Sequence, residues 1–349
     1  MFVAGLGGFL QRFVEPLAMA LRNEGYVTIG VAAAMADSAA FNRTYSLPPY
    51  RRRGPFAALR ALACLHRIVK SERPQVLHLH NPPAIGLGRL VAKQQGIPSI
   101  ATISATFLDS MSMRSIVFRV SEFVSAGWSA ITITSNSQDT AYYKRHASAE
   151  SVVEAPFGGM GIDMNFVEQA RAQPSKVGGR PSIIVVGRLT PEKRLDLIAK
   201  AFPEVRAVEP NASLTFLGSA QAGDSPWSVP KEPGISHIPW AEDPYPFIAG
   251  ADVLVSASGR EAFSMVVAEA ILLGTPAVST PNRGVADIAL VAPGLVQITE
   301  PTSQAIAKAI LLAAKRPRLG FDERLSQRWS QASAIAFHTD MIHRTAGRP

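Results

Sequence analysis

The sequence predicts an α/β protein made of two doubly wound, Rossmann-like domains, and three observations lead to this prediction. The chain of 349 residues exceeds the length over which one hydrophobic core keeps growing, so two domains are expected. In both halves, short apolar runs alternate with amphipathic stretches, as in proteins whose parallel strands are joined by crossover helices. Near the midpoint, residues 166–180 are polar and contain Gln173-Pro174-Ser175 and Gly178-Gly179, which is typical of a linker.

The expected elements follow this alternation along the chain. Residues 1–8 are expected to form a first strand that runs into a turn. Further strands of the first half are expected at 27–33, 76–80, 99–103 and 130–134, with helices at 14–23, 55–70 and 84–95. Strands of the second half are expected at 182–187, 213–218, 235–238, 252–256 and 277–280. The predicted division is a first domain (1–165), a linker (166–180), a second domain (181–320) and a helical tail (321–349) that packs across the junction.

Composition limits the environment and the partners of the protein. Cys64 is the single cysteine, so the chain cannot form an internal disulfide or a thiolate metal cluster, and a reducing, cytoplasmic location is expected. The apolar runs are far shorter than the ~20 residues that span a bilayer. The formal net charge is +8, and residues 1–165 hold sixteen Lys and Arg against ten Asp and Glu. This excess favours anionic partners such as phosphorylated substrates, anionic lipid or nucleic acid.

Two glutamates mark the first candidate site, in the segment Ser258–Pro276. A strand is expected to end near Ser258, so that Glu261 lies in a loop and Glu269 lies on a helix that Ser264 would cap. Both carboxylates then lie at the carboxyl edge of a parallel sheet, where ligands bind, and the helix amino terminus offers N–H groups to phosphate. The alternative for Glu269 is a partly exposed position on the helix surface.

Two cations mark the second candidate site, in the segment Ile183–Leu195. A strand is expected to end at Gly187, and Thr190 would cap the helix that follows. Arg188 and Lys193 would then flank a helix amino terminus at the carboxyl edge of the sheet. Together they would neutralise a diphosphate, the arginine as a planar fork and the lysine as a point charge. The alternative is a pair of solvated surface cations.

The combination of these motifs resembles glycosyltransferase family four, and the resemblance covers nearly the whole chain. Gly187-Arg188 followed by Lys193 matches the family's Gly-Arg…Lys pattern. Arg260-Glu261-Ala262-Phe263 is similar to its Arg-Glu-Gly-Phe, and the spacing of Glu261 and Glu269 reproduces Glu-x7-Glu. The resemblance implies the GT-B fold, in which two Rossmann-like domains face each other across a cleft. It also implies a retaining transferase that uses a nucleotide-sugar.

The resemblance further implies a role for each matching residue. Glu261 would bind hydroxyls of the donor sugar, and Glu269 would bind the nucleotide ribose. Arg188 and Lys193 would bind the diphosphate and stabilise the charge of the leaving group. No metal or other cofactor is then expected, because these two cations replace a divalent ion. The remaining nucleotide-sugar contacts would come largely from the backbone of Gly7, Gly8, Gly187, Phe263, Ser264, Met265 and Val266.

Two departures from the family pattern concern the first domain and the glutamate loop. Thr102-Ile103-Ser104 stands where the family has Thr-x-His, so the histidine that usually reaches the sugar is missing. The candidates for this sugar or acceptor contact are His80, Asn81 and Ser104. We expect His78 in the core and His80 in the cleft. Ala262 replaces the usual glycine, a change that restricts the dihedral angles of the loop.

Three functions are compatible with the sequence. The favoured one is transfer from a UDP-sugar, or less readily a GDP-sugar, to a glycolipid or oligosaccharide acceptor during lipopolysaccharide, capsule or other surface polysaccharide synthesis. The alternatives are a GT-B sugar-nucleotide epimerase or hydrolase, and an idle protein that binds a nucleotide-sugar or lipid. Basic amphipathic segments at Arg51–Lys70 and Met111–Arg119 predict peripheral binding to an anionic membrane surface, the inner face of the plasma membrane. No nucleic-acid partner is expected.

Overall fold

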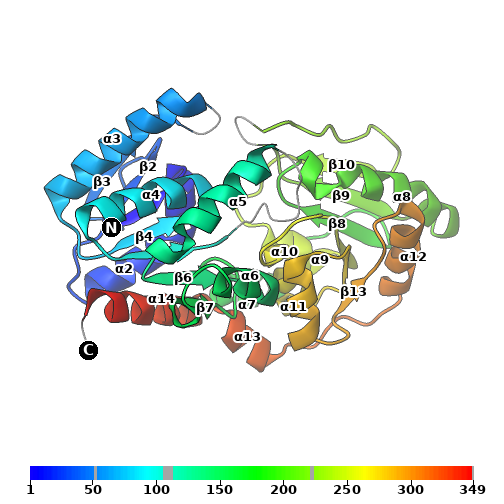
Figure 1. Ribbon diagram of the computed structural model, residues 1–349. Coiled ribbons are helices and arrows are strands. Elements are labelled where there is room, and N and C mark those ends of the chain that lie inside the picture. The colour runs from blue at the N-terminus through cyan, green and yellow to red at the C-terminus, as the bar shows by residue number, and fades with distance from the viewer. Residues whose placement is uncertain (51–52, 105–112, 221–223, 348–349) are drawn as a thin grey trace. The chain divides into compact units, whose positions relative to one another are not determined.

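The computed structural model describes residues 1–50, 53–104, 113–220 and 224–347, with residues 113–115 described by their backbone alone. These residues divide into two compact units, and many of their elements are labelled in Figure 1. Unit 1 comprises Met1–Gly161 and Gln331–Pro349, and unit 2 comprises Ile162–Ser330. Within the described ranges, every helix is too short or too polar to cross a bilayer.

Unit 1 is built on a parallel β-sheet. Its described strands are β1 (Phe2–Ala4), β2 (Ile29–Ala33), β3 (Arg43–Leu47), β4 (Leu77–His80), β5 (Ser99–Thr102), β6 (Ile131–Thr134) and β7 (Val152–Glu154). Its helices are α1 (Gly7–Phe13), α2 (Glu15–Asn23), α3 (Gly54–Glu72), α4 (Pro82–Gln95), α5 (Met113–Ser125), α6 (Ser137–Lys144) and α14 (Gln331–Ala346), with 3-10 turns η1 (Ala126–Trp128) and η2 (Ala149–Ser151). The strand order is β3-β2-β1-β4-β5-β6-β7, and neighbouring strands pair in parallel.

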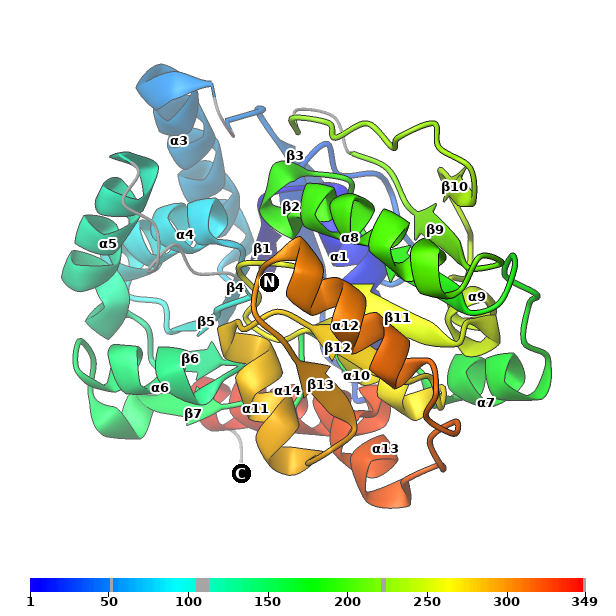
Figure 2. The same cartoon turned by 90° about the vertical axis from the view of Figure 1, so that its right-hand side faces the viewer.

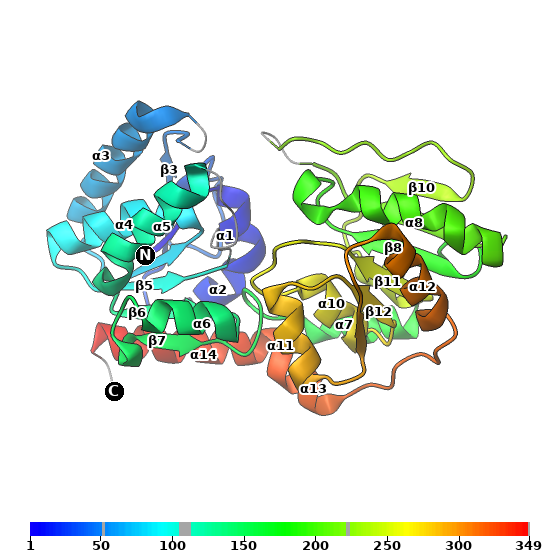
Figure 3. The ribbon, with the colours of Figure 1, turned by 45° about the vertical axis from the view of Figure 1, so that its right-hand side comes forward.

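Helices cover both faces of this sheet, because alternate side chains of each strand point to opposite faces. On one face, Leu79 of β4 belongs to an apolar cluster with Leu65 of α3 and Ile85 of α4. On the other face, α14 packs against α2 and β5, and the three elements are labelled in Figure 3. Here the ring of His338 on α14 lies 5.3 Å from that of His78 on β4, between centroids. The carboxyl-terminal helix therefore completes the core of unit 1.

Unit 2 repeats this architecture with a second parallel sheet. Its described strands are β8 (Ser182–Val186), β9 (Ser213–Leu217), β10 (Ile235–Ile238), β11 (Val253–Ser256), β12 (Ala277–Ser279) and β13 (Val296–Ile298). Its helices are α7 (Met164–Ala172), α8 (Leu195–Val208), α9 (Tyr245–Gly250), α10 (Met265–Leu272), α11 (Arg283–Val291), α12 (Ser303–Ala313) and α13 (Glu323–Trp329), with the 3-10 turn η3 (Pro191–Lys193). The strand order is β10-β9-β8-β11-β12-β13, again parallel throughout (Figure 2).

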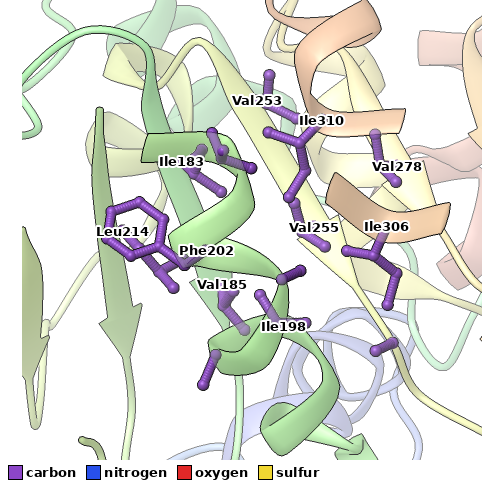
Figure 4. Packing of buried hydrophobic residues seen from close by; sticks show 14 of the residues in the cluster. Ile183, Val185, Ile198, Phe202, Leu214, Val253, Val255, Val278, Ile306 and Ile310 are labelled. Carbon is purple, nitrogen blue, oxygen red and sulfur yellow. The ribbon is translucent and has the colours of Figure 1, made fainter. Parts of the chain in front are cut away.

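The core of unit 2 lies between this sheet and the helices α8 and α12. Val185 and Val255 from the sheet meet Phe202 of α8 and Ile310 of α12 (Figure 4), and none of the four side chains is more than 4% exposed. Burying each such side chain stabilises the fold by about 1.5 to 3 kcal/mol. Helix α10 packs against β11 and β12. This packing fixes the strand ends on which the candidate site is built.

The expected strands all form, with ends that differ from the prediction by a few residues. The structure adds β3, β7 and β13, which the apolar pattern did not mark. Strand β3 lies at the edge of its sheet and has mostly exposed or half-buried side chains, so it lacks a continuous apolar run. Strands β7 and β13 have three residues each, too few for a periodic pattern to indicate a strand.

The two units end at positions that differ from the predicted domain boundaries. Residues 164–172, most of them in the predicted linker, form α7 within unit 2. Asp163 caps this helix, its carboxylate accepting a hydrogen bond from the backbone N–H of Asn165 (2.9 Å). The polar residues that suggested a linker include the exposed surface of α7. The predicted tail is also divided, because α13 belongs to unit 2 and α14 to unit 1.

Candidate functional site

Close contact between two glycines shapes the carboxyl edge of the sheet in unit 2. Strand β8 ends before Gly187 (φ 139°), and β9 ends before Gly218 (φ 128°). A Cβ atom on Gly218 would lie 2.1 Å from the carbonyl oxygen of Gly187, so only glycine permits this approach. The chain therefore leaves β8 at a fixed point, from which it carries Arg188 and Lys193.

The helix predicted after Gly187 is a single 3-10 turn, η3, followed by a separate helix. Arg194 has a left-handed backbone conformation (φ 49°, ψ 41°) that separates η3 from α8. Thr190 precedes η3, but its hydroxyl makes no capping hydrogen bond, which corrects the prediction. Thr190 Oγ1 is buried, and it has no hydrogen-bond partner among the described residues. A buried hydroxyl of this kind is a candidate ligand contact.

Lys193 lies beside Glu261, the residue expected to bind the sugar. The Nζ atom of Lys193 is 2.5 Å from Oε1 of Glu261, and the two side chains are 24% and 18% exposed. Because both groups are mostly withdrawn from solvent, salt screens their attraction less than it screens an exposed pair. The two motifs, 68 positions apart in the sequence, thus meet at one point.

The loop that carries Glu261 is fixed by backbone contacts on two sides. The N–H of Gly259 donates to the carbonyl oxygen of Glu192 (3.2 Å), and the N–H of Gly284 donates to that of Glu261 (3.1 Å). A Cβ atom on Gly284 would lie 2.7 Å from Cα of Phe263, so α11 packs directly onto the loop. The position of Glu261 is therefore determined by the fold of unit 2.

Ala262, the departure from the family glycine, fits this loop. Its side chain is 8% exposed. The residues with a positive φ in the described part of the chain do not include it, so the backbone at this position does not require glycine. The substitution gives no reason to expect a distorted Glu261 loop.

Arg188 pairs with two carboxylates that sequence reasoning did not identify. Its Nη1 atom donates to both carboxylate oxygens of Asp224, at 3.1 and 3.3 Å. Its Nη2 atom lies 3.5 Å from Oε1 of Glu192. The Asp224 side chain is 11% exposed, whereas Arg188 is 43% exposed. Arg188 is thus anchored on Asp224 and still offers further N–H donors to an anion.

Glu269 lies on α10, the helix that begins after Ser264. Its carboxylate accepts a hydrogen bond from the hydroxyl of Tyr245 (3.3 Å), and its side chain is half-buried.

Ser264 makes no side-chain capping bond, contrary to the prediction, and its backbone (φ −83°, ψ 79°) departs from the extended conformation usual for a cap. Its buried Oγ atom has no partner within the described chain. The backbone N–H of Met265 donates to the carbonyl oxygen of Phe263 (3.0 Å).

Several of these groups line a small pocket at the carboxyl edge of the sheet. Its walls combine the two cations and two serines with apolar side chains at the ends of β8 and β11, and the cations are the groups that suit an anionic ligand. The lining includes Gly187, Arg188, Lys193, Ser256, Ser258 and Val266.

The candidate residues of unit 1 lie at the ends of its strands. Gly7 and Gly8 begin α1. A Cβ atom on Gly7 would lie 2.5 Å from the carbonyl oxygen of Ala34, which explains this glycine by packing, whereas Gly8 is exposed and has open space around it. Asn81 is half-buried, and its Oδ1 accepts a hydrogen bond from a backbone N–H (3.3 Å). Ser104 is half-buried.

His80 is a core residue in this structure, which corrects the expectation that it faces a ligand. Its side chain is 2% exposed, and its ring lies 4.3 Å from that of His78 and 5.6 Å from that of Phe9, between centroids. Burial lowers the pKa of His80 to about 3. Residues two apart on a strand share a face, so both histidines face α14 rather than one facing the core and the other a ligand.

Besides Glu192, three residues near the candidate site escaped sequence reasoning. Asp224 and Tyr245 stand outside any motif, and only the fold brings them to Arg188 and Glu269. Trp240 follows β10 and is 75% exposed. Because β10 runs parallel to β9, Trp240 lies at the same edge of the sheet as Gly218. A tryptophan two residues after an expected strand is a signal that was already visible in the sequence.

Two protein-family models match the chain and together cover most of it. Residues 10–158 match the model described as "Glycosyl transferase 4-like domain". Residues 166–334 match the model described as "Glycosyl transferases group 1". The first match lies almost entirely in unit 1 and the second almost entirely in unit 2.

Two curated relatives, both named as mannosyltransferases, match the chain at low sequence identity. The chain is 27% identical over 250 residues to a phosphatidyl-myo-inositol mannosyltransferase of Propionibacterium freudenreichii, a match that covers 70% of this chain and 62% of the relative. It is 27% identical over 278 residues to a GDP-mannose-dependent alpha-mannosyltransferase of Mycolicibacterium smegmatis, covering 74% and 70%. The chain thus spans less than two thirds of the length of the first relative.

Solved structures share the fold over nearly the full length of the chain. A sucrose-phosphate synthase from Thermosynechococcus elongatus superposes with a TM-score of 0.78 at 17% identity, covering 98% of both chains. The Anabaena protein HepE, solved in complex with UDP and glucose, superposes with a TM-score of 0.71 at 15% identity, also covering 98% of both. The fold, the motifs and the two family models agree: the chain has the GT-B fold, and its two halves belong to the glycosyltransferase families that these two models describe.

Proposed function

We propose that this glycosyltransferase moves a sugar from a nucleotide-sugar to a hydroxyl of a glycolipid or oligosaccharide acceptor, with retention at the anomeric carbon. The observation that carries the proposal is the meeting of Lys193 with Glu261, next to the pocket that Arg188 lines. Cations for a diphosphate and a carboxylate for sugar hydroxyls then lie within one site. The name of the first relative, a mannosyltransferase that acts on a phosphatidyl-inositol, supports a lipid-linked acceptor.

The proposed reaction is a displacement on one face of the sugar. The bond between the anomeric carbon and the β-phosphate oxygen breaks, and the acceptor oxygen forms the new bond to that carbon. The acceptor proton passes to the departing phosphate oxygen. Arg188 and Lys193 stabilise the negative charge that grows on the diphosphate, while Glu261 accepts hydrogen bonds from the sugar. These residues supply the positive charge that the leaving group needs, so the proposed reaction uses no cofactor.

We propose a UDP-sugar as the donor, with a GDP-sugar as the second candidate. The complex of HepE with UDP supports the former, and the name of the mycobacterial relative supports the latter. In either case the exposed indole of Trp240 offers a flat surface on which a base can stack. The ribose would be held by Glu269.

Incubation with UDP-glucose, UDP-N-acetylglucosamine, GDP-mannose and GDP-fucose tests the function. We expect at least one donor to raise the melting temperature and to release nucleotide only when an acceptor extract is added. Release of nucleotide without acceptor, or interconversion of the sugar, would indicate the hydrolase or epimerase alternative. A melting shift that is never followed by turnover would indicate an idle binding protein.

Glu269→Ala is expected to weaken nucleotide binding about tenfold or more, because a charged hydrogen bond contributes about 1.5 to 3 kcal/mol. Calorimetric titration with UDP and GDP measures the effect. Tyr245→Phe is the matched control, since it removes the hydroxyl that bonds Glu269 and leaves the carboxylate in place. Equal affinity of Glu269→Ala and the parent protein would exclude the ribose role.

A surface of unit 1 fits the proposed membrane partner. Helix α4 packs between α3 and α5, and α3 and α5 bear exposed apolar side chains, among them Phe56 (81% exposed) and Phe123 (70% exposed). Arg53 and Arg60 are exposed near Phe56 in the sequence. An apolar surface with adjacent cations is typical of binding to anionic lipid. Some residues of the predicted basic segments lie outside the described part of the chain: Arg51, Arg52, Met111 and Ser112, and the side chains of Met113, Arg114 and Ser115.

The protein is expected to sediment with vesicles that contain anionic lipid, and less so at high salt, because each cation near the surface contributes about 1 kcal/mol that salt screens. Phe123→Asp should reduce the bound fraction several-fold, whereas Leu290→Asp should not. Leu290 is 77% exposed on α11 of unit 2 and serves as the control. Equal binding to neutral and anionic vesicles would contradict the proposal.

A further inference from the structure

Both cations of the donor site are already paired with carboxylates of the chain. Arg188 holds Asp224 through Nη1 and lies 3.5 Å from Glu192, and Lys193 holds Glu261. Of these carboxylates, Asp224 is the most shielded from solvent, at 11% exposed, whereas Glu192 is 38% exposed. Asp224 is therefore a fixed negative charge beside the group that is proposed to bind the diphosphate.

The charges of this cluster affect the affinity of any charged ligand that binds there. Three carboxylates lie beside the two cations, so they offset part of the positive charge that Arg188 and Lys193 offer to a ligand. Arg188 uses only one of its terminal nitrogens for Asp224, and a guanidinium has five N–H donors. A phosphate can therefore bind Arg188 while Asp224 remains attached to it. Under these conditions Asp224 repels every additional negative charge on the ligand.

The substrate and the product of the proposed reaction differ by such a charge. In a nucleotide-sugar, the β-phosphate is esterified by the sugar and carries one negative charge. After transfer, the same phosphate is a terminal group with a second pKa near 6, so it carries nearly one further charge at neutral pH. A fixed carboxylate beside Arg188 therefore opposes binding of the nucleoside diphosphate product more strongly than binding of the nucleotide-sugar.

We propose that Asp224 is a positioning residue that also sets selectivity: it holds Arg188 in place and weakens binding of the nucleoside diphosphate product relative to the nucleotide-sugar, which favours product release. The inference rests on the proposed function. A purely structural role for Asp224 makes a different prediction, because loss of the anchor would then weaken both ligands to the same extent.

The test compares the affinities of UDP and UDP-glucose, and of GDP and GDP-mannose, for the parent protein and for Asp224→Asn at pH 7.5. We expect the ratio of diphosphate affinity to nucleotide-sugar affinity to rise about fivefold in Asp224→Asn, since partly exposed charges contribute up to about 1 kcal/mol. Asp224→Glu, which keeps the charge, should restore the parent ratio. Asp196→Asn, at a position on α8 that is 51% exposed, should leave it unchanged.

The outcomes separate this inference from the proposed function. An unchanged ratio in Asp224→Asn, with both ligands bound, overturns the selectivity role and leaves the glycosyltransferase proposal standing. Equal weakening of both ligands also overturns it and assigns Asp224 to anchoring alone. If the folded parent protein binds none of the four ligands, the proposed donor site fails and the inference fails with it.

Discussion

Lys193→Ala is expected to slow sugar transfer by about two orders of magnitude and to change the affinity for the nucleotide much less. The expectation follows from its position, because Nζ lies beside Glu261, the carboxylate proposed to bind the sugar, and Lys193 lines the same pocket as Arg188. A preorganised charge at that point acts mainly where negative charge grows in the transition state. Removing one comparable donor from an oxyanion site costs about 3 kcal/mol.

The measurement separates kcat from KM for the donor identified in the nucleotide-sugar panel. Lys200→Ala is the matched control. Lys200 is 69% exposed on α8, and among the described side chains its ion-pair partner is Asp196. Lys193→Arg keeps the charge but not the shape of the ammonium, so it should recover part of the rate. A Lys193→Ala variant that turned over at the parental rate would remove the diphosphate role from this lysine.

The fold could be predicted because buried parallel strands have continuous apolar runs. Such strands are covered by helices on both faces, and their runs, as in Ser182–Val186 and Val253–Ser256, stand out in the sequence. The edge strand Arg43–Leu47 has no such run. The polar stretch at 166–180 has the composition of a linker, but Asp163 caps a helix there, and a local hydrogen bond of this kind is not visible in composition.

The candidate site was predictable only in part, for a similar reason. Strand ends place Arg188, Lys193 and Glu261 at one edge of the sheet, and the sequence motifs mark all three residues. Their partners depend on long-range packing: Asp224 is 36 positions from Arg188, and no periodic pattern connects them. Tertiary contacts of this kind also decide which polar residues become core residues.

His80 illustrates this limit, because its environment is completed from the far end of the chain. Strand periodicity assigns a side chain to a face of the sheet but does not say what covers that face. In unit 1 the cover is α14, which places His338 within 5.3 Å of His78, between ring centroids. A histidine that looks like a ligand contact at a strand end is therefore part of a buried cluster, the three-histidine cluster of His78, His80 and His338.

The three-histidine cluster should make unit 1 sensitive to acid. All three rings are buried among Phe2, Phe9 and Phe157 or against one another. Burial lowers the pKa of His80 to about 3 and the pKa of His338 to about 4. It also lowers the pKa of His78 well below its usual 6.5. The neighbouring imidazoles lower the pKa values of His78 and His80 further. The folded protein thus keeps these rings neutral over a range in which the unfolded chain protonates them.

The sign of the effect on stability follows from this difference. As the pH falls below 6.5, the unfolded chain takes up protons that the folded protein does not, so the free energy of unfolding decreases. At pH 5 the loss is about 2 kcal/mol for each of His80 and His338. For a unit of this size, the combined loss lowers the melting temperature by roughly 10 °C relative to pH 7.5.

Thermal unfolding of the parent protein and of His80→Phe, followed from pH 7.5 to pH 5, tests this expectation. The phenylalanine keeps an aromatic ring against Phe2 and Phe9 and removes one titrating group, so the melting temperature should fall less steeply with acid. His237→Phe is the control, because His237 is exposed on β10 of unit 2 and should leave the slope unchanged. A parent melting temperature that stays constant between pH 7.5 and pH 5 would show that the cluster is accessible to protons in the folded state, and His80 would again be a candidate for ligand contact.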